Sequence, residues 1–465
     1  MDRNLLDTKT TSELLDMFGA GEHKPGSGSA AALQGMLSAQ LILTVISLTI
    51  DPKRHDAYKH CVEKTKEAAE DIRSRIYPTL QRLFLEDSAL FDKVIKLRVQ
   101  RDAEKNPIKK QQFDDEATAA LTPATEIPVE IAELCAELAV YGVFIFDNGF
   151  KSARGDASVA MNGAVSAIAG CLSIIDLNLL KFEPSDWSAN ISTQAKLLRT
   201  KYETLSAKSF AGLDDLSGEL TKNIDFYSRA NAFKTPQALS SDKEIEDYTI
   251  YLQRFMWVYR KKIWGKDAPK LPLEMLKPEL AIRFIGYNFQ EMVTLGQHVD
   301  KGITFDVAGI IHNPEKSISI SEQFPLEYRN FTAAHELGHA LMHEQNVLHR
   351  DRPLDGSNNS PQKDNIEYQA DKFATYFLMP EKQVRRAFET MYLTSLFEIS
   401  DLRVNLALAK DADKLRNASN IRDLSIILTS LEYYNGKPRS SLAKLFNVST
   451  TAMARRLEEL DLVRF

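Results

Sequence analysis

The sequence has few cysteines, little net charge and no low-complexity tract. Its three cysteines, Cys61, Cys135 and Cys171, lie far apart and form no CxxC pair, so nothing suggests a cysteine metal site. The net charge of −6 over 465 residues argues against a chain devoted wholly to nucleic acid. The first residues, MDRNLLDTKTTSELL, lack the apolar core of a signal peptide. Reduced thiols together with this N-terminus favour a cytoplasmic location.

Two long apolar stretches require a decision about membranes. Residues 30–50 and 157–177 are each long enough to span a bilayer. However, Gln34, Gln40 and Asn162 interrupt them, and small residues are frequent in both. We therefore expect closely packed helices inside a soluble domain, and no membrane partner.

A chain of 465 residues exceeds one ordinary hydrophobic core, so several domains are expected. Residues 1–210 have helical periodicity almost throughout, which predicts an all-helical first domain. Residues 211–245 are polar and are interpreted as a helical linker. Breaks between the first helices are expected at Pro25-Gly26, around Asn106-Pro107, at Pro123, near Gly149 and Gly155, and at Pro184.

The second half has a different character. The segment Ile303 to Ser321 predicts two short strands joined by a turn at Asn313 to Lys316, and a helix is expected from about Leu326 to Gln345. Arg350 to Lys363 is polar and rich in turn formers, as a mobile loop would be. Helices resume from Ile366 to the end. The fold class is therefore multidomain and mainly α.

We divide this second half into an α+β domain with a small sheet, residues 246–385, and a helical tail, residues 386–465. The central motif of the α+β domain is HELGH. Its histidines, His335 and His339, are four residues apart, so on a helix both imidazoles project from one face. That spacing suits two ligands of a tetrahedral zinc, and Glu336 is placed to act as the general base.

A catalytic zinc of this type needs a third protein ligand from elsewhere in the chain. Glu367 is the candidate, because it follows the polar loop on the next expected helix. Considered by itself, Glu367 could equally be an acid at the N-terminus of a helix, where the helix dipole favours negative charge. Asp371, one turn later, could hydrogen-bond a ligand histidine. His343 is interpreted as a packing or supporting group and His349 as a loop residue.

The run from Asp306 to Pro380 resembles the ImmA/IrrE family of metallopeptidases. Three segments carry the resemblance: AGIIHNPEKSISIS, YRNFTAAHELGHALMH and EYQADKFATYFLMP. It implies a gluzincin-like cytoplasmic endopeptidase that cleaves transcriptional repressors in stress, phage or mobile-element responses. It also implies His335, His339 and Glu367 as zinc ligands and Glu336 as base. The strand Ser317 to Ser321 would lie beside the cleft and pair with an extended substrate.

The oxyanion-stabilising group of such a peptidase is not identified by the motif. Tyr368 and Tyr376 are the two candidates on the expected helix after the loop.

Near the N-terminus, EHKPGSGSAAA precedes a helix rich in small residues. Pro25, Gly26, Gly28 and Ser29 lie in this loop, where glycines permit close approach of backbone to a ligand and a helix N-terminus attracts anions. By itself such a segment is usually only a helix cap.

Residues 11–182 resemble the cyclodeaminase/cyclohydrolase family, the helical folate enzymes related to formiminotransferase-cyclodeaminase. PGSGSAAALQG, LEDSALF, ATEIPVEIA and NGFKSARGDASVAMNGAVSAIAG carry the resemblance. It implies a helical homodimeric domain that binds a folate-like ligand, with Asp87 as a proton-transfer candidate and Asp156 before the second buried helix. The glycine run reads GSG, and Ile174 stands where an asparagine is expected. Both departures bear on catalysis more than on the fold.

The tail segment Ser440 to Leu460 resembles a helix-turn-helix, with the turn at Asn447 to Ser449, and Thr450 or Thr451 capping the second helix. Arg455 and Arg456 on that helix could contact DNA phosphates. The alternative is a small module that packs on the peptidase or holds its substrate, which we favour slightly.

Three functions remain open from the sequence. The first is a regulatory zinc endopeptidase whose N-terminal domain senses a ligand or forms the dimer. The second is a folate-type cyclohydrolase or cyclodeaminase with an accessory peptidase domain. The third is DNA-binding regulation without proteolysis, which depends on the tail alone.

Overall fold

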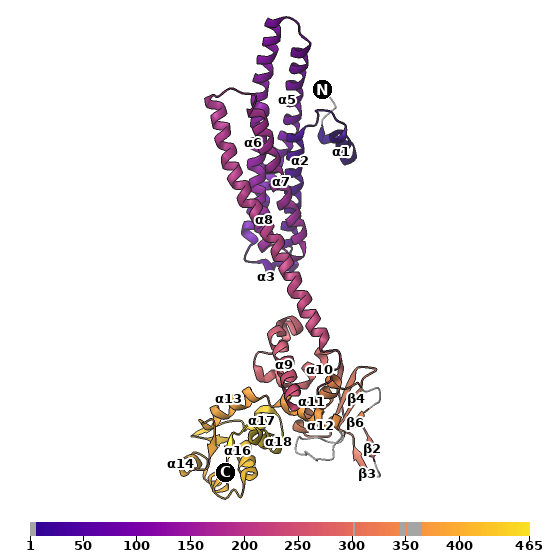
Figure 1. The fold of residues 1–465 in the computed structure, drawn as a ribbon, viewed down its shortest axis with the longest axis vertical. Coiled ribbons are helices and arrows are strands. Elements are labelled where there is room, and N and C mark those ends of the chain that lie inside the picture. The colour runs from indigo at the N-terminus through magenta and orange to yellow at the C-terminus, as the bar shows by residue number, and fades with distance from the viewer. Residues whose placement is uncertain (1–5, 301–302, 345–348, 352–364) are drawn as a thin grey trace. The chain divides into compact units, whose positions relative to one another are not determined.

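The computed structural model describes residues 6–300, 303–344, 349–351 and 365–465. The chain divides into two compact units, Met1–Lys222 and Asn223–Phe465. The first is all-helical, and the second combines helices with a small sheet (Figure 1). The predicted fold class, multidomain and mainly α, is confirmed. The predicted boundaries at 210, 245 and 385 stay predictions.

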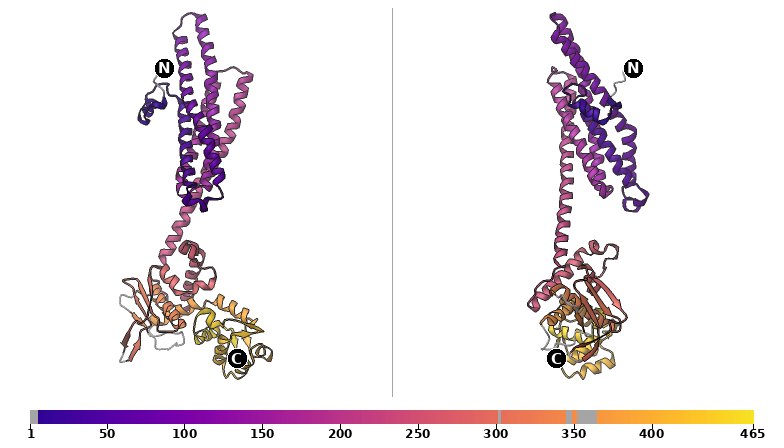
Figure 2. Two further views of the ribbon diagram at one scale, coloured as in Figure 1. Left: turned by 180° about the vertical axis from the view of Figure 1, so that it is seen from behind. Right: turned by 90° about the vertical axis from the view of Figure 1, so that its right-hand side faces the viewer.

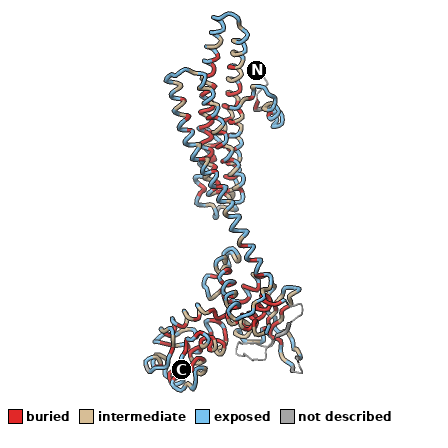
Figure 3. Tube along the Cα trace, viewed as in Figure 1, coloured by how far each residue is buried: buried red, intermediate tan, exposed pale blue. Residues whose placement is uncertain are grey.

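The first unit is a bundle of long helices packed around α2. Its helices are α1 (Thr11–Gly19), α2 (Ser27–Thr49), α3 (His55–Tyr58), α4 (Val62–Asp71), α5 (Tyr77–Ala103), α6 (Pro107–Asn148), α7 (Arg154–Leu179) and α8 (Asp186–Ala232), with a π turn, η3 (Ile72–Ile76), before α5. Small residues set the spacing of the bundle. A Cβ at Gly35 would meet Cys135 Sγ at 2.8 Å, and one at Gly163 would meet Ser38 Oγ at 2.7 Å. Figure 3 colours the buried residues red along the Cα trace.

The two apolar stretches form α2 and the helical segment Lys151–Leu179, which lies in the bundle with α5 and α6. Both are long and apolar enough to cross a membrane, and half of the most apolar window of each is buried inside the protein. Burial against other helices accounts for that composition in a bundle core. The expectation of no membrane partner stays a prediction.

One predicted helix break is wrong. The helix α6 runs unbroken through Pro123 and Pro128. Each internal proline removes one backbone hydrogen bond and costs about 3 kcal/mol. Helix α6 packs along both α5 and α7, so burial of apolar side chains on two faces offsets that cost. Propensity is a weak guide where tertiary packing is this extensive.

The predicted linker is largely continuous helix. Residues 211–232 are the last part of α8, and the boundary between the units falls inside that helix. The next helix, α9 (Asp242–Trp264), begins at a capping box in which Ser241 caps the backbone of Glu244 and the Glu244 side chain returns the bond.

The second unit contains a four-stranded sheet beside two helices. The strands follow the order β1 (Asn288–Met292), β5 (Ser317–Ser321), β4 (Gly309–His312), β6 (His349–Asp351). A separate hairpin pairs β2 (Gln297–Asp300) with β3 (Ile303–Asp306). The sheet lies against α11 (Leu326–Met342), which packs in turn on α12 (Asn365–Leu378); the short α10 (Pro278–Phe284) also packs on α11.

The expected pair of strands on either side of the turn at Asn313 to Lys316 is confirmed, since β4 and β5 pair antiparallel. The first strand is shorter than expected, because the chain breaks at Val307 and Ala308 and residues 303–306 form β3 in a different sheet. The expectation that Ser317 to Ser321 pairs with an extended substrate is wrong, because β5 pairs with β1 on one side and β4 on the other. Sequence reasoning missed β1, a polar strand without clear alternation.

The tail belongs to the same unit. It contains α13 (Glu381–Tyr392), α14 (Asp401–Val404), α15 (Ala409–Arg416), α16 (Ile421–Ser430), α17 (Leu442–Phe446) and α18 (Thr450–Glu459), with the strand pairs β7 (Phe397–Glu398) with β10 (Val463–Arg464) and β8 (Tyr433–Tyr434) with β9 (Lys437–Pro438). One apolar core runs from Phe226, near the end of α8, to Val463 in β10. The sheet and the tail lie on opposite sides of α11 and α12 (Figures 1 and 2).

The predicted helix–turn–helix segment forms α17, a turn and α18. Asn447 has left-handed backbone angles, and Ser449 caps α18. Neither Thr450 nor Thr451 is the cap, since Ser449 Oγ accepts from the Ala452 backbone N–H. Most of α18 is buried or half-buried against the rest of the unit.

Candidate metal centre

The pair of histidines lies on a fully enclosed part of α11. His335, Glu336 and His339 are all 0% exposed. Gly338, between the histidines, lets α12 approach closely, because a Cβ there would lie 3.2 Å from Ala370 Cα. Close contact with α12 is what brings the distant glutamate to this face.

Three side chains converge at this point. His335 Nε2 lies 2.9 Å from His339 Nε2. Glu367, half-buried on α12, places one carboxylate oxygen 3.3 Å from His335 Nε2 and the other 3.4 Å from His339 Nε2. One ligand atom from each residue lies within 4.8 Å of the others, so the three form a group able to hold a metal ion.

The hydrogen-bond partner of His335 determines which of its two ring nitrogens carries the proton. Asp371 Oδ1 lies 2.9 Å from His335 Nδ1. A carboxylate only accepts hydrogen bonds, so the imidazole donates from Nδ1 and presents a lone pair at Nε2. Carboxylates commonly hold metal-binding histidines in this way.

A second relay orients His339. Gln369 Nε2 donates to the carbonyl of Leu239 at 2.9 Å, so its Oε1 faces the ring of His343. His343 therefore donates from Nε2 and accepts at Nδ1, which lies 3.0 Å from His339 Nδ1. His339 then donates from Nδ1 and presents a lone pair at Nε2.

These assignments leave electron-rich atoms facing one another. Two imidazole lone pairs and a carboxylate meet at 2.9–3.4 Å. Such an arrangement is repulsive by itself and becomes favourable around a cation. Ligands about 2.0–2.1 Å from a tetrahedral zinc lie about 3.3 Å from each other. The donor set and its spacing fit that ion.

Glu336 lies beside the pair, on the sheet side of α11. A Cβ at Gly309, in β4, would come within 2.6 Å of Glu336 Oε1 and equally near Thr332 Cγ2. Only glycine fits this contact between strand and helix. A glycine inside a strand often marks such a close approach, which is the signal that could have identified Gly309 from the sequence.

The tyrosine candidates face away from the histidines. Tyr368 donates its hydroxyl to Asp242 on α9 at 3.0 Å. The ring of Tyr376 lies 4.9 Å from the Arg456 guanidinium, and burial raises the pKa of Tyr376 to about 12. The interpretation of His349 as a loop residue is wrong, because its backbone pairs with Ile311 as part of strand β6. Most of Arg350 to Lys363 lies outside the described residues.

The first unit has a separate buried acid. Asp87 on α5 is 6% exposed, and its Oδ2 accepts from Ser29 N–H at 2.7 Å and from Ser29 Oγ at 2.9 Å. Gly28 makes this possible, because a Cβ there would lie 2.0 Å from Asp87 Oδ1. Burial raises the pKa of Asp87, while the two bonds from Ser29 oppose that rise. A Cβ at Gly26 would still lie 4.0 Å from the same carboxylate.

Three of the predicted loop residues, Gly26, Gly28 and Ser29, lie close to Asp87, and Pro25 directly precedes them in the chain. Asp156 is elsewhere. It is exposed at the start of α7, near the end of α2, where Phe150 N–H donates to Thr49 Oγ1 at 3.0 Å. The two ends of the 23-residue α2 are about 35 Å apart.

Comparisons with known proteins agree with this division. Residues 10–197 match the formiminotransferase-cyclodeaminase family, and residues 279–400 match the IrrE N-terminal-like domain. A methenyltetrahydrofolate cyclohydrolase of Methylorubrum extorquens is 29% identical over 170 residues, covering 36% of this chain and 75% of the relative.

A solved formiminotetrahydrofolate cyclodeaminase of Thermotoga maritima gives a TM-score of 0.40 at 17% identity, covering 46% of this chain and 99% of the other. The two family matches fall in different units of the chain. This chain therefore joins a helical region that matches the formiminotransferase-cyclodeaminase family to a region that matches the IrrE N-terminal-like domain.

Proposed function

We propose that the chain is a zinc-dependent endopeptidase that cleaves a specific regulatory protein. One observation carries the proposal: the Nε2 atoms of two imidazoles on α11 and the carboxylate of Glu367 on α12 converge at one point. The match of residues 279–400 to the IrrE-like family supports it.

The chain's own residues would share the work as follows. His335, His339 and Glu367 would hold the ion, and Asp371 and Gln369 would keep the imidazoles in the ligating tautomer. A zinc ion would lower the pKa of a water and polarise the scissile carbonyl. Glu336 would accept a proton at its carboxylate and return it to the leaving amine.

The substrate we propose is a transcriptional repressor or another protein of a stress or mobile-element response, and the location is the cytoplasm. Support comes from the resemblance to the ImmA/IrrE family. Strands β1 and β6 are the outer strands in the sheet order, so either is better placed than β5 to pair with an extended chain.

The test is a cleavage assay on repressors encoded near this gene. We expect cleavage by the zinc-loaded protein, loss after chelation, and recovery on adding zinc. Glu336→Gln should retain zinc but lose about 10²–10⁴-fold in rate, since it removes the general base alone. Cleavage that persists at the original rate in this variant would contradict the assignment.

A second function has its own supporting observation. Asp87 is a buried acid held at the N-terminus of α2, in a domain similar to a methenyltetrahydrofolate cyclohydrolase. We propose that this domain binds a folate-like ligand, as sensor or enzyme, and forms the homodimer. Turnover of methenyl- or formimino-folate that Asp87→Ala abolishes would make it an enzyme. Binding without turnover would make it a sensor.

For the tail, we propose a packing module that supports the peptidase in preference to a DNA-binding element. Ala452, Met453, Arg456 and Leu457 of α18 are buried within the unit, whereas a recognition helix must present its face to the groove. Salt-sensitive binding of the full chain to duplex DNA, lost on substituting Arg455, would favour DNA.

A further inference from the structure

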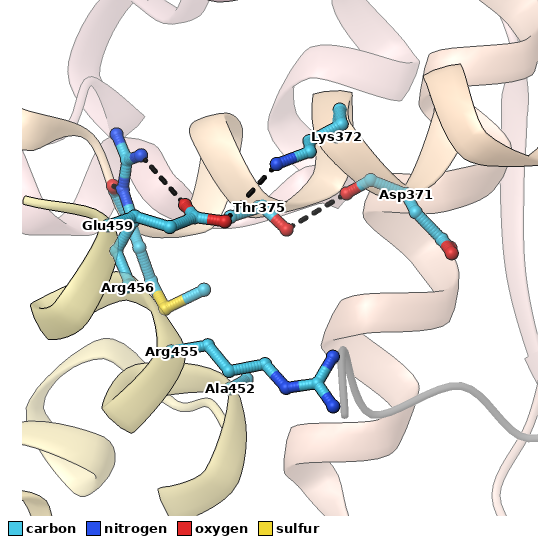
Figure 4. A pocket seen from close by; sticks show the side chains of 8 residues that line it. Asp371, Lys372, Thr375, Ala452, Arg455, Arg456 and Glu459 are labelled. Carbon is cyan, nitrogen blue, oxygen red and sulfur yellow. Dashed lines mark hydrogen bonds and ion pairs between the residues drawn. The ribbon is translucent and has the colours of Figure 1, made fainter. Parts of the chain in front are cut away.

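A small pocket between α12 and α18 is lined by three cations, one of which has no ion pair among the described residues. Its lining is Asp371, Lys372, Thr375 and Met379 from the α12 side and Ala452, Arg455, Arg456 and Glu459 from α18. Figure 4 shows Arg455 extending from α18 toward α12, opposite the Lys372–Glu459 pair.

Two of the three cations in this pocket, Arg456 and Lys372, have acidic partners. Arg456 donates to the Met379 carbonyl at 3.0 Å and pairs with Glu246 at 2.8 Å and Glu459 at 3.2 Å. Lys372 pairs with Glu459 at 3.1 Å. Burial lowers the pKa of Lys372, but Glu459 and other neighbours raise it above its usual value, so this ammonium stays charged.

Arg455 differs from both. Within the described part of the chain it has no ion pair, and its Nε is buried without a hydrogen-bond partner. The acids of the pocket are engaged elsewhere, Asp371 with His335 and Glu459 with Lys372 and Arg456. A buried guanidinium nitrogen without an acceptor is unfavourable unless a ligand supplies one.

The geometry points to an oxyanion site here: we propose that the pocket binds one carboxylate or phosphate group on the Nε–Nη edge of Arg455. That edge presents two parallel N–H donors, which match two oxygens of such a group. The anion could be a free metabolite or an acidic group of the protein substrate.

The site adjoins the metal centre through one residue. Asp371 lines the pocket and accepts from His335 Nδ1. The proposal does not depend on peptidase activity, since anion binding is measurable in a protein that cleaves nothing. Loss of cleavage and loss of anion binding are therefore separable results.

The experiment is calorimetric titration of the zinc-loaded full chain at constant ionic strength. The probes are inorganic phosphate and an acetylated, amidated tetraglutamate peptide. Arg455→Gln should weaken binding of the recognised probe about tenfold or more, as expected for a charge-assisted bidentate contact. Arg455→Lys keeps the charge, removes the fork and should give an intermediate loss.

Arg416→Gln is the matched control. Arg416 is an exposed arginine on α15, paired with Asp413, and its loss removes the same charge outside the pocket. A phosphate effect specific to Arg455 identifies a free anion, and a peptide effect without a phosphate effect identifies a substrate group. Equal binding by the parent, Arg455→Gln and Arg416→Gln, or no binding by the parent, overturns the site.

Discussion

The two units build their candidate sites in different ways. In the first, Gly28 and Ser29 allow α2 to touch Asp87, and close packing holds a lone buried acid. In the second, Asp371 and Gln369 orient two histidines through hydrogen bonds. Asp87 only accepts hydrogen bonds from its neighbour Ser29, whereas Asp371 and Gln369 orient imidazoles that can serve as metal ligands. The first site should respond to added volume and the second to lost polar partners.

The largest expected effect is a loss of stability when the polar contacts between α18 and the rest of the second unit are removed. Arg456→Met removes a 4% exposed guanidinium side chain and leaves Glu246 and Glu459 without it. We expect a loss of about 3 kcal/mol in unfolding free energy, measured by urea denaturation of the full chain. Arg422→Met, which breaks the more exposed pair with Glu458, should cost less than about 1 kcal/mol. Equal losses of unfolding free energy in the two variants would show that the buried contacts of Arg456 stabilise the unit no more than a surface ion pair does.

The next effect tests the hydrogen bond to His335. Asp371→Asn keeps the shape but weakens the acceptor opposite Nδ1. We expect metal affinity to fall about 10–100-fold in a chelator competition. Asp242→Asn changes an exposed acid that bonds Tyr368 instead, and should leave the affinity unchanged. Unchanged affinity in Asp371→Asn would separate this carboxylate from the metal centre.

A smaller effect tests packing in the first unit. Gly28→Ala places a methyl group 2.0 Å from Asp87 Oδ1, so the Ser29 contacts must shift. We expect a cost of about 1–3 kcal/mol in the unfolding of the bundle. Gly155→Ala is the control in α7, where a Cβ meets nothing within 4 Å, and should stabilise the bundle by about 0.5–1 kcal/mol. An unchanged free energy of unfolding in Gly28→Ala would show that the start of α2 can shift away from Asp87 without cost.

The last effect is a pH dependence. Burial raises the pKa of Asp87 above its unfolded value, so the contribution of its protonated form to stability is present at low pH and lost as pH rises through the folded pKa. The side chain in the Asp87→Asn variant cannot ionise, so the variant does not lose this contribution as pH rises. The stability of the variant relative to the parent should therefore increase from acid to neutral pH. A difference independent of pH would contradict the raised pKa.

The sequence predicted the parts of the site that depend on local spacing better than the parts that depend on contacts between distant segments. His335, Glu336 and His339 lie within one helix, so spacing alone placed them together. Glu367 could be named as a candidate from its place after the polar loop, but its approach to the histidines depends on Gly338 and α12 packing closely. Gln369, whose amide reaches back to Leu239, carried no signal in the motif.

The errors in the fold have the same origin. Proline at 123 favours a break, yet packing on two neighbouring helices keeps α6 intact. The polar strand β1 shows no alternation and exists because β5 offers it an edge. Arg455 and Arg456 suggested phosphate contacts, but only the tertiary structure shows one satisfied and the other not.

X-ray absorption at the zinc edge tests the central claim most directly. The zinc-loaded full chain should bind one equivalent and show only nitrogen and oxygen neighbours at about 2.0–2.1 Å, with the scattering pattern of two imidazoles. Glu367→Gln should lose an oxygen neighbour or most of its zinc. Sulfur neighbours, a single imidazole, or an unchanged spectrum in His339→Ala would contradict a centre built from His335, His339 and Glu367.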